Sequence, residues 1–131
     1  MKAIIFDQHG GSEVLHLAEV PTPTPKAGEV LVQVAYCALN HLDLFVREGW
    51  KGLRLDMPHI LGSDVAGRVA ALGEGVEGWQ VGQRVVVNGN LSCGQCEHCL
   101  KGHDHRCIRH AILGEHVRGG YAEYVAVPAA N

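Results

Sequence analysis

The sequence predicts a mainly β domain: a partly open β-barrel with one short helix and a metal-binding loop. Three observations predict this fold class. Short segments alternate apolar and polar residues, glycine-rich turns separate them, and four cysteines crowd into one stretch. Glycine accounts for 17 of 131 residues, about 13% where about 7% is usual, which favours many turns. A chain of this length suits a single domain, placed at residues 1–131.

Composition argues against several classes of function. Hydrophobic residues make up 47% and charged residues 19%, an ordinary globular balance. The net charge of −3 lacks the basic excess expected of a nucleic-acid partner. The apolar run Ile4-Ile5-Phe6 is too short for a signal peptide or a membrane span. We therefore expect a cytoplasmic protein without nucleic-acid or membrane partners.

Six segments read as strands. They are residues 1–6, 15–20, 29–39, 63–72, 84–87 and 121–127. The third is the clearest, because Val30, Val32 and Val34 alternate onto one face. Three prolines between residues 21 and 25 remove donors for strand pairing, so this segment should run as extended backbone over the surface.

One short helix is expected after the third strand. Asn40 suits the N-cap position, Asp43 follows three residues later, and Gly49 stops a helix over residues 41–47. Residues 50–58 should then form a loop.

A glycine pattern in residues 73–78 matches G-x-G-x-x-G, a dinucleotide-binding fingerprint. Such a fingerprint requires a helix directly after the glycines, so that the helix N-terminus meets the diphosphate. Here Gly78 leads through Trp79 and Gly82 into another strand. We therefore interpret the pattern as a plain strand–strand turn.

The cysteine stretch has the spacing C-x2-C-x2-C-x7-C. Its members are Cys93, Cys96, Cys99 and Cys107, within a loop of about residues 91–110. Four thiolates can close around one zinc ion at about 2.3 Å, which leaves no open coordination position. The spacing therefore predicts a structural zinc site rather than a catalytic one.

Other interpretations of these residues remain open. The bacterial iron–sulfur run ends C-x3-C-P, whereas here the last gap is seven residues and Ile108 follows, which disfavours a cluster. Disulfides are disfavoured in a reducing compartment. Three histidines could each replace one cysteine as a zinc ligand: His98, His103 and His105. Outside the loop, Cys37 reads as a small buried apolar residue and His59 as a packed or partly exposed loop residue.

Four further segments, with the cysteine loop, carry a resemblance to a known family. They read Gly-Glu-Val-Leu-Val-Gln-Val at 28–34, Leu-Gly-Ser-Asp-Val-Ala-Gly at 61–67, Gly-Gln-Arg-Val at 82–85 and Gly-Gly-Tyr-Ala-Glu-Tyr at 119–124. In this order they resemble the N-terminal domain of the medium-chain dehydrogenase/reductase family, which includes alcohol dehydrogenases and quinone oxidoreductases. The resemblance implies a GroES-like fold in which the four loop cysteines hold a structural Zn2+.

The sequence departs from the zinc alcohol dehydrogenases of that family. Their Cys-x-Ser/Thr-Asp and Gly-His-Glu segments supply a cysteine and a histidine to a catalytic zinc. At these positions the chain carries Asn40 and Ser63, which are poor zinc ligands. Leu42 also lacks the hydroxyl that would relay the alcohol proton. We therefore expect no catalytic zinc.

What remains resembles the quinone-oxidoreductase branch, which uses no catalytic metal. The resemblance implies hydride transfer from NADPH or NADH to a small quinone, enone or carbonyl substrate. It places Asn40 and Ser63 in the catalytic pocket and Asn40 and His41 near the cofactor. Asp43 and Asp64 correspond to acids around the missing metal.

Family members continue into a Rossmann domain that binds the nicotinamide, and the resemblance implies a homo-oligomer for the full-length protein. We expect this chain to be the N-terminal part of such an enzyme, inactive by itself. Two alternatives are a zinc-dependent alcohol dehydrogenase domain with unusual ligands and a non-enzymatic zinc-binding β-domain.

Overall fold

The structure, a computed structural model, describes residues 1–131. Its strands are β1 (Lys2–Ile5), β2 (His16–Glu19), β3 (Glu29–Ala38), β4 (Asp64–Leu72), β5 (Arg84–Val86), β6 (Asn90–Leu91), β7 (Ala111–Ile112) and β8 (Tyr124–Pro128). Its helices are α1 (His41–Glu48) and the single turn α2 (Glu97–Leu100), with 3-10 turns at Ser12–Val14 and Asp104–Arg106. None of these helices has the length and apolar character needed to cross a bilayer.

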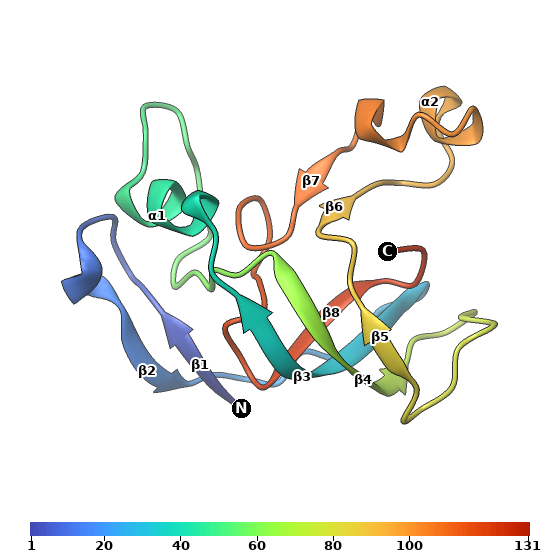
Figure 1. The fold of residues 1–131 in the computed structure, drawn as a ribbon, viewed down its shortest axis with the longest axis horizontal. Helices are drawn as coiled ribbons and strands as arrows, with labels where there is room; N and C mark the ends of the chain where they lie inside the picture. The colour runs from blue at the N-terminus through green and yellow to red at the C-terminus, as the bar shows by residue number, and fades with distance from the viewer.

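Three antiparallel sheets form the domain. The central one has the order β5-β4-β3-β8, and the pairs β1-β2 and β6-β7 flank it (Figure 1). The sheets are open and none closes into a barrel, which confirms the prediction of a mainly β, partly open architecture.

The long strands β3 and β4 pair along most of their length and position the candidate site at one end. Their register runs from Val30 opposite Leu72 to Ala38 opposite Asp64, with two irregularities between. Val30 and Val32 are buried in the main core, as their alternation predicts, and Val34 packs against it. The end of the ladder at Ala38 and Asp64 therefore brings the residues that follow β3 beside the start of β4.

Helix α1 begins at His41 and ends at Glu48, which confirms the predicted helix, and Asn40 is its N-cap. The carboxylate of Asp43 accepts a hydrogen bond from the backbone N–H of Asn40 at 2.7 Å, and Gly49 ends the helix with φ +77°. The side-chain amide of Asn40 also donates to Asp64 of β4. The N-cap residue therefore ties the start of the helix to the neighbouring strand.

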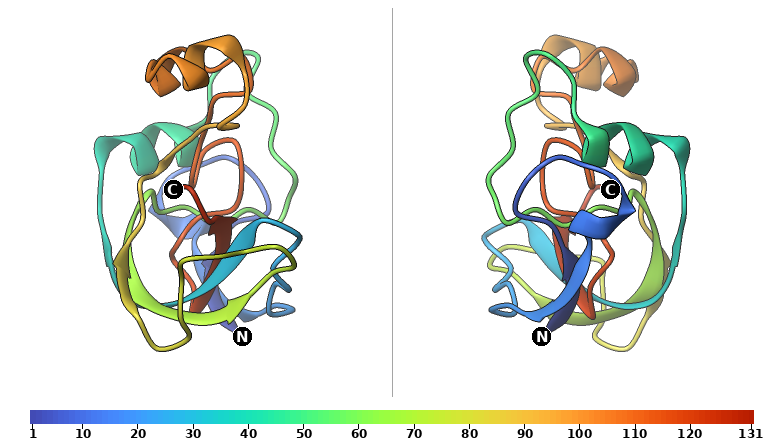
Figure 2. Two further views of the ribbon diagram at one scale, coloured as in Figure 1. Left: turned by 90° about the vertical axis from the view of Figure 1, so that its right-hand side faces the viewer. Right: turned by 90° about the vertical axis from the view of Figure 1, so that its left-hand side faces the viewer.

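The cysteine loop projects from the body of the domain as a lobe on a short stem. The stem is the β6-β7 pair, in which Leu91 lies opposite Ala111. In every view α2 lies at one extremity of the molecule and the N-terminus lies at the other (Figures 1 and 2). The sequence predicts only an irregular loop here. The helix α2 and the two strands of the stem are therefore elements that the sequence analysis does not predict. They are too short to leave a periodic pattern in the sequence.

Two expectations about the remaining segments have different outcomes. The glycine pattern at 73–78 lies in the connection between β4 and β5, without a helix, which confirms the plain-turn interpretation. The last strand begins at Tyr124 rather than at Tyr121. The earlier residues pair elsewhere: the backbone N–H of Tyr121 donates to Leu61, and Ala122 bridges to Ala3.

Candidate functional site

The four loop cysteines converge on one point, although they come from different parts of the lobe. Their sulfur atoms all lie within 4.8 Å of one another. The Sγ atoms of Cys96 and Cys99 are 3.4 Å apart, and those of Cys93 and Cys99 are 3.9 Å apart. Four sulfurs placed tetrahedrally around zinc would be separated by about 3.8 Å, given a bond of about 2.3 Å. The donor set and its spacing therefore fit one zinc ion.

Backbone N–H groups surround these sulfurs. The N–H groups of Cys93 and Arg109 each donate to the Sγ of Cys107 at 3.3 Å, and that of Cys96 donates to Cys93 at 3.3 Å. Such donors favour the thiolate form that binds metal. A hydrogen bond from the backbone of Gln95 is the main cause that lowers the pKa of Cys93 to about 6, whereas burial is the main cause that raises the pKa of Cys99 to about 11.

The histidines of the lobe stand outside this cluster. No histidine nitrogen joins the four sulfurs within the 4.8 Å set, so the geometry favours four cysteine ligands over three cysteines and a histidine. The rings of His103 and His105 contact each other with centroids 6.0 Å apart, and both residues are exposed.

A second candidate site lies where β3 passes into α1. The Nδ2 atom of Asn40 donates to Oδ2 of Asp64 at 3.0 Å, which joins the start of α1 to the start of β4. Ser63 precedes Asp64 and is only 8% exposed, and its hydroxyl has no hydrogen-bond partner. The structure thus brings the predicted pocket positions Asn40 and Ser63 to neighbouring points of the fold.

His41 is the first residue of α1 and is exposed. Its ring lies 6.5 Å from that of Phe45, and it makes no side-chain hydrogen bond. The structure therefore leaves the predicted cofactor residue free on the surface beside Asn40.

Asp43 lies beneath Asn40 and is only 4% exposed. Its carboxylate accepts hydrogen bonds from the backbone N–H groups of Asn40 and Gly62 and from the hydroxyl of Tyr121, at 2.7, 3.0 and 2.8 Å. Sequence reasoning missed Tyr121, because the residue is 78 positions from Asp43 and no local pattern marks it.

Cys37 is half-buried rather than fully buried as predicted, and it packs against the edge of the main core. Burial, followed by the negative charges of Asp43 and Asp64, raises the pKa of its thiol to about 11. Burial and the Asp43 hydrogen bond likewise raise the pKa of Tyr121 well above its ordinary value. Both groups therefore stay protonated at neutral pH.

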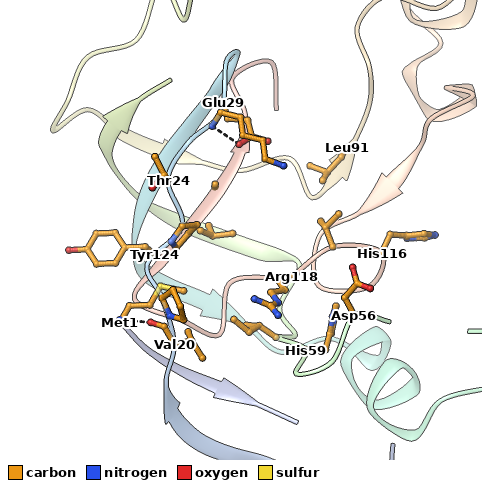
Figure 3. Close-up of a pocket in the computed structure, with 18 of the residues that line it drawn as sticks. Met1, Val20, Thr24, Glu29, Asp56, His59, Leu91, His116, Arg118 and Tyr124 are labelled. Atoms are coloured by element: carbon orange, nitrogen blue, oxygen red, sulfur yellow. Dashed lines mark hydrogen bonds between the residues drawn. The ribbon is translucent and has the colours of Figure 1, made fainter. Parts of the chain in front are cut away.

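His59 is buried, as the packed interpretation predicts, and it lines a groove of about 520 Å³ between β8 and the proline-rich segment. Figure 3 shows His59 near Asp56 and Arg118 at one end of this groove. Its Nε2 atom lies 3.1 Å from the carbonyl oxygen of Gly114, and burial is the main cause that lowers its pKa. Neither Asn40 nor Ser63 lines the groove, so it is distinct from the candidate site.

Comparisons with known proteins agree with this fold. Residues 26–131 match the family model of the alcohol dehydrogenase GroES-like domain. An L-threonine 3-dehydrogenase of Stenotrophomonas maltophilia (strain K279a) is 36% identical over 133 residues, which is 100% of this chain and 38% of that protein. The chain therefore spans less than half the length of this curated relative.

Two solved structures have a higher sequence identity to this chain. An NAD-dependent alcohol dehydrogenase superposes with a TM-score of 0.95 at 51% identity, over 100% of this chain and 38% of that one. A cobalt and zinc bound thermostable alcohol dehydrogenase from Pyrobaculum aerophilum superposes with a TM-score of 0.92 at 44% identity, over 100% of this chain and 40% of that one. The chain belongs to the alcohol dehydrogenase GroES-like domain family, within the zinc-type medium-chain dehydrogenases/reductases.

Proposed function

We propose that this domain is the N-terminal catalytic part of an NAD(P)H-dependent oxidoreductase of the quinone-oxidoreductase-like branch. In this proposal the lobe cysteines hold one structural zinc, and the pocket at Asn40 and Ser63 works without a metal. The substrate is a small quinone, enone or carbonyl compound. A larger polypeptide that contains this chain would carry out the reaction.

The observation that carries the proposal is the hydrogen bond between Asn40 and Asp64. It occupies the carboxylate with an amide donor, at 3.0 Å. The hydroxyl of Ser63 is a weak metal ligand in comparison with a thiolate or an imidazole, which zinc prefers. This donor set supports chemistry without a Lewis-acid zinc.

The residues present suit the binding of a carbonyl oxygen. An asparagine amide has two N–H groups, and the bond to Asp64 uses one of them. The other N–H can donate to a substrate oxygen and stabilise the negative charge that develops there. Bound NAD(P)H supplies the hydride, and solvent supplies the proton. In this proposal His41, which is exposed beside Asn40, contacts the cofactor.

A pocket of about 300 Å³ on α1 is lined by Leu42, Phe45 and Trp50 together with Glu48, Gly49 and Glu115. Neither Asn40 nor Ser63 lines it, so the substrate class in this proposal rests on the resemblance to the quinone-oxidoreductase branch.

A second candidate function is zinc-dependent alcohol oxidation with unusual ligands. The names of the similar proteins favour it, since they are alcohol and threonine dehydrogenases and one is described as cobalt and zinc bound. A third candidate is a non-enzymatic zinc-binding β-domain.

Steady-state kinetics on the longer polypeptide test the proposal. We expect oxidation of NADPH or NADH by a quinone or an enone at a rate that a metal chelator does not reduce. Oxidation of ethanol or threonine that a chelator abolishes would favour the zinc-dependent alternative. The absence of both reactions in a folded protein that binds nicotinamide would favour the non-enzymatic domain.

A further inference from the structure

The buried carboxylate of Asp43 joins three distant segments of the chain. Its Oδ2 atom accepts from the backbone of Asn40 and from the hydroxyl of Tyr121, and its Oδ1 atom accepts from the backbone of Gly62. No lysine, arginine or histidine pairs with it. Its charge therefore depends on neutral donors, and each donor contributes more than a hydrogen bond at the surface would.

Tyr121 supplies the only side-chain donor of the three. Its ring packs over Gly62, where a Cβ atom would come within 2.6 Å of the ring and 2.7 Å of the sulfur of Cys37. The glycine also has φ +102°, a conformation that side-chain-bearing residues rarely adopt. This close approach holds the phenol at 2.8 Å from Asp43.

We propose that Tyr121 is a positioning residue of the candidate site, which acts through Asp43 to hold Asn40 in place. The Tyr121 hydroxyl orients the carboxylate, and the carboxylate holds the backbone of Asn40 and Gly62. Gly62 immediately precedes Ser63, so the same carboxylate orients both pocket positions. Tyr121 itself contacts no substrate in this proposal.

The inference rests on the proposed function only in taking Asn40 as the residue that faces the substrate. The hydrogen-bond network can be measured without turnover. A failure of the proposed chemistry is therefore distinguishable from a failure of the positioning role.

The test compares Tyr121→Phe with a matched control, Tyr124→Phe. Both substitutions remove one hydroxyl from a half-buried tyrosine, and the hydroxyl of Tyr124 makes no hydrogen bond to the protein. Amide hydrogen exchange measured by NMR reads the network directly. In Tyr121→Phe we expect the N–H groups of Asn40 and Gly62 to exchange about 10-fold faster, with a shift of the Asn40 side-chain amide signals. In the control, Tyr124→Phe, the exchange rates of both backbone N–H groups and the Asn40 side-chain signals should stay unchanged.

The positioning role also predicts a kinetic signature in the longer enzyme, where Tyr121→Phe should lower kcat and leave KM for the nicotinamide unchanged. Unchanged exchange at Asn40 and Gly62 in folded Tyr121→Phe would overturn the proposal. An equal acceleration over all of β3 and β4 would also overturn it, because that result indicates only global destabilisation. If Tyr121→Phe does not fold, Asp43→Asn must accelerate the same two amides and leave β1 and β2 unaffected, or the proposal fails.

Discussion

The side-chain amide of Asn40 donates a 3.0 Å hydrogen bond to the carboxylate of Asp64. The two residues are 24 positions apart, and the antiparallel pairing of β3 with β4 brings them together. The same end of the ladder places Ser63 alongside. This hydrogen bond holds the start of α1 against the start of β4.

Substitution of Asn40 should affect activity more than folding. Asn40→Ala removes one side-chain hydrogen bond to a partner that is exposed, so we expect the free energy of unfolding to fall by about 1 kcal/mol. Turnover in the longer enzyme should fall by a larger factor, since a donor to the substrate oxygen is lost. Urea denaturation and steady-state rates measure the two effects. Gln33→Ala, an exposed change on β3, serves as the control, and a comparable loss of turnover in it would contradict this expectation.

Loss of a lobe cysteine should release the metal and loosen the lobe alone. We expect Cys96→Ala to lose its zinc and to become sensitive to trypsin after Lys101, Arg106 and Arg109, because the metal orders this segment. The β core should remain folded, since it buries its own apolar residues. Elemental analysis measures the loss of zinc, and mapping of the tryptic fragments measures the loosening of the lobe. Cys37→Ala, which lies outside the lobe, should keep its zinc; loss of zinc in that variant would argue against the assignment.

Acid should destabilise the domain through His59. Burial lowers the pKa of this histidine in the folded protein, so the unfolded chain binds a proton more readily. Stability should therefore decline as the pH falls below about 6.5, at up to about 1.4 kcal/mol per pH unit. Denaturation of zinc-saturated protein across this range measures the slope. His59→Gln should flatten it, whereas His41→Gln, an exposed change, should not.

The thiol of Cys37 should react slowly with alkylating reagents. Its pKa of about 11 implies that about one molecule in a thousand carries the reactive thiolate at pH 8. Asp64→Asn removes one of the two charges that raise this pKa, so the pH at which labelling becomes fast should fall. Mass spectrometry of iodoacetamide labelling across pH provides the measurement. Asp56→Asn is the control, and an equal change in that variant would exclude a specific effect of Asp64.

Local patterns in the sequence predicted most of the framework. The alternation in residues 29–39 identified β3, and the Asn40, Asp43 and Gly49 signals bounded α1, because these features depend on neighbouring residues. The convergence of the cysteines also followed from short spacing.

Long-range pairings could not be predicted in this way. The Asn40 side chain meets Asp64 of another strand, and Tyr121 reaches Asp43 across 78 positions. No local period records such partners, since they depend on the folded arrangement of strands and loops. The same reason explains why β8 begins later than its apolar pattern suggests: Tyr121 is already paired with Leu61.

The zinc content of the purified protein tests the central claim most directly. The account predicts one zinc ion per chain, lost in Cys96→Ala and unchanged in the double variant Asn40→Ala, Ser63→Ala. Two zinc ions per chain, one of them lost in the double variant, would contradict it, because the second ion would then lie in the pocket that we propose works without metal.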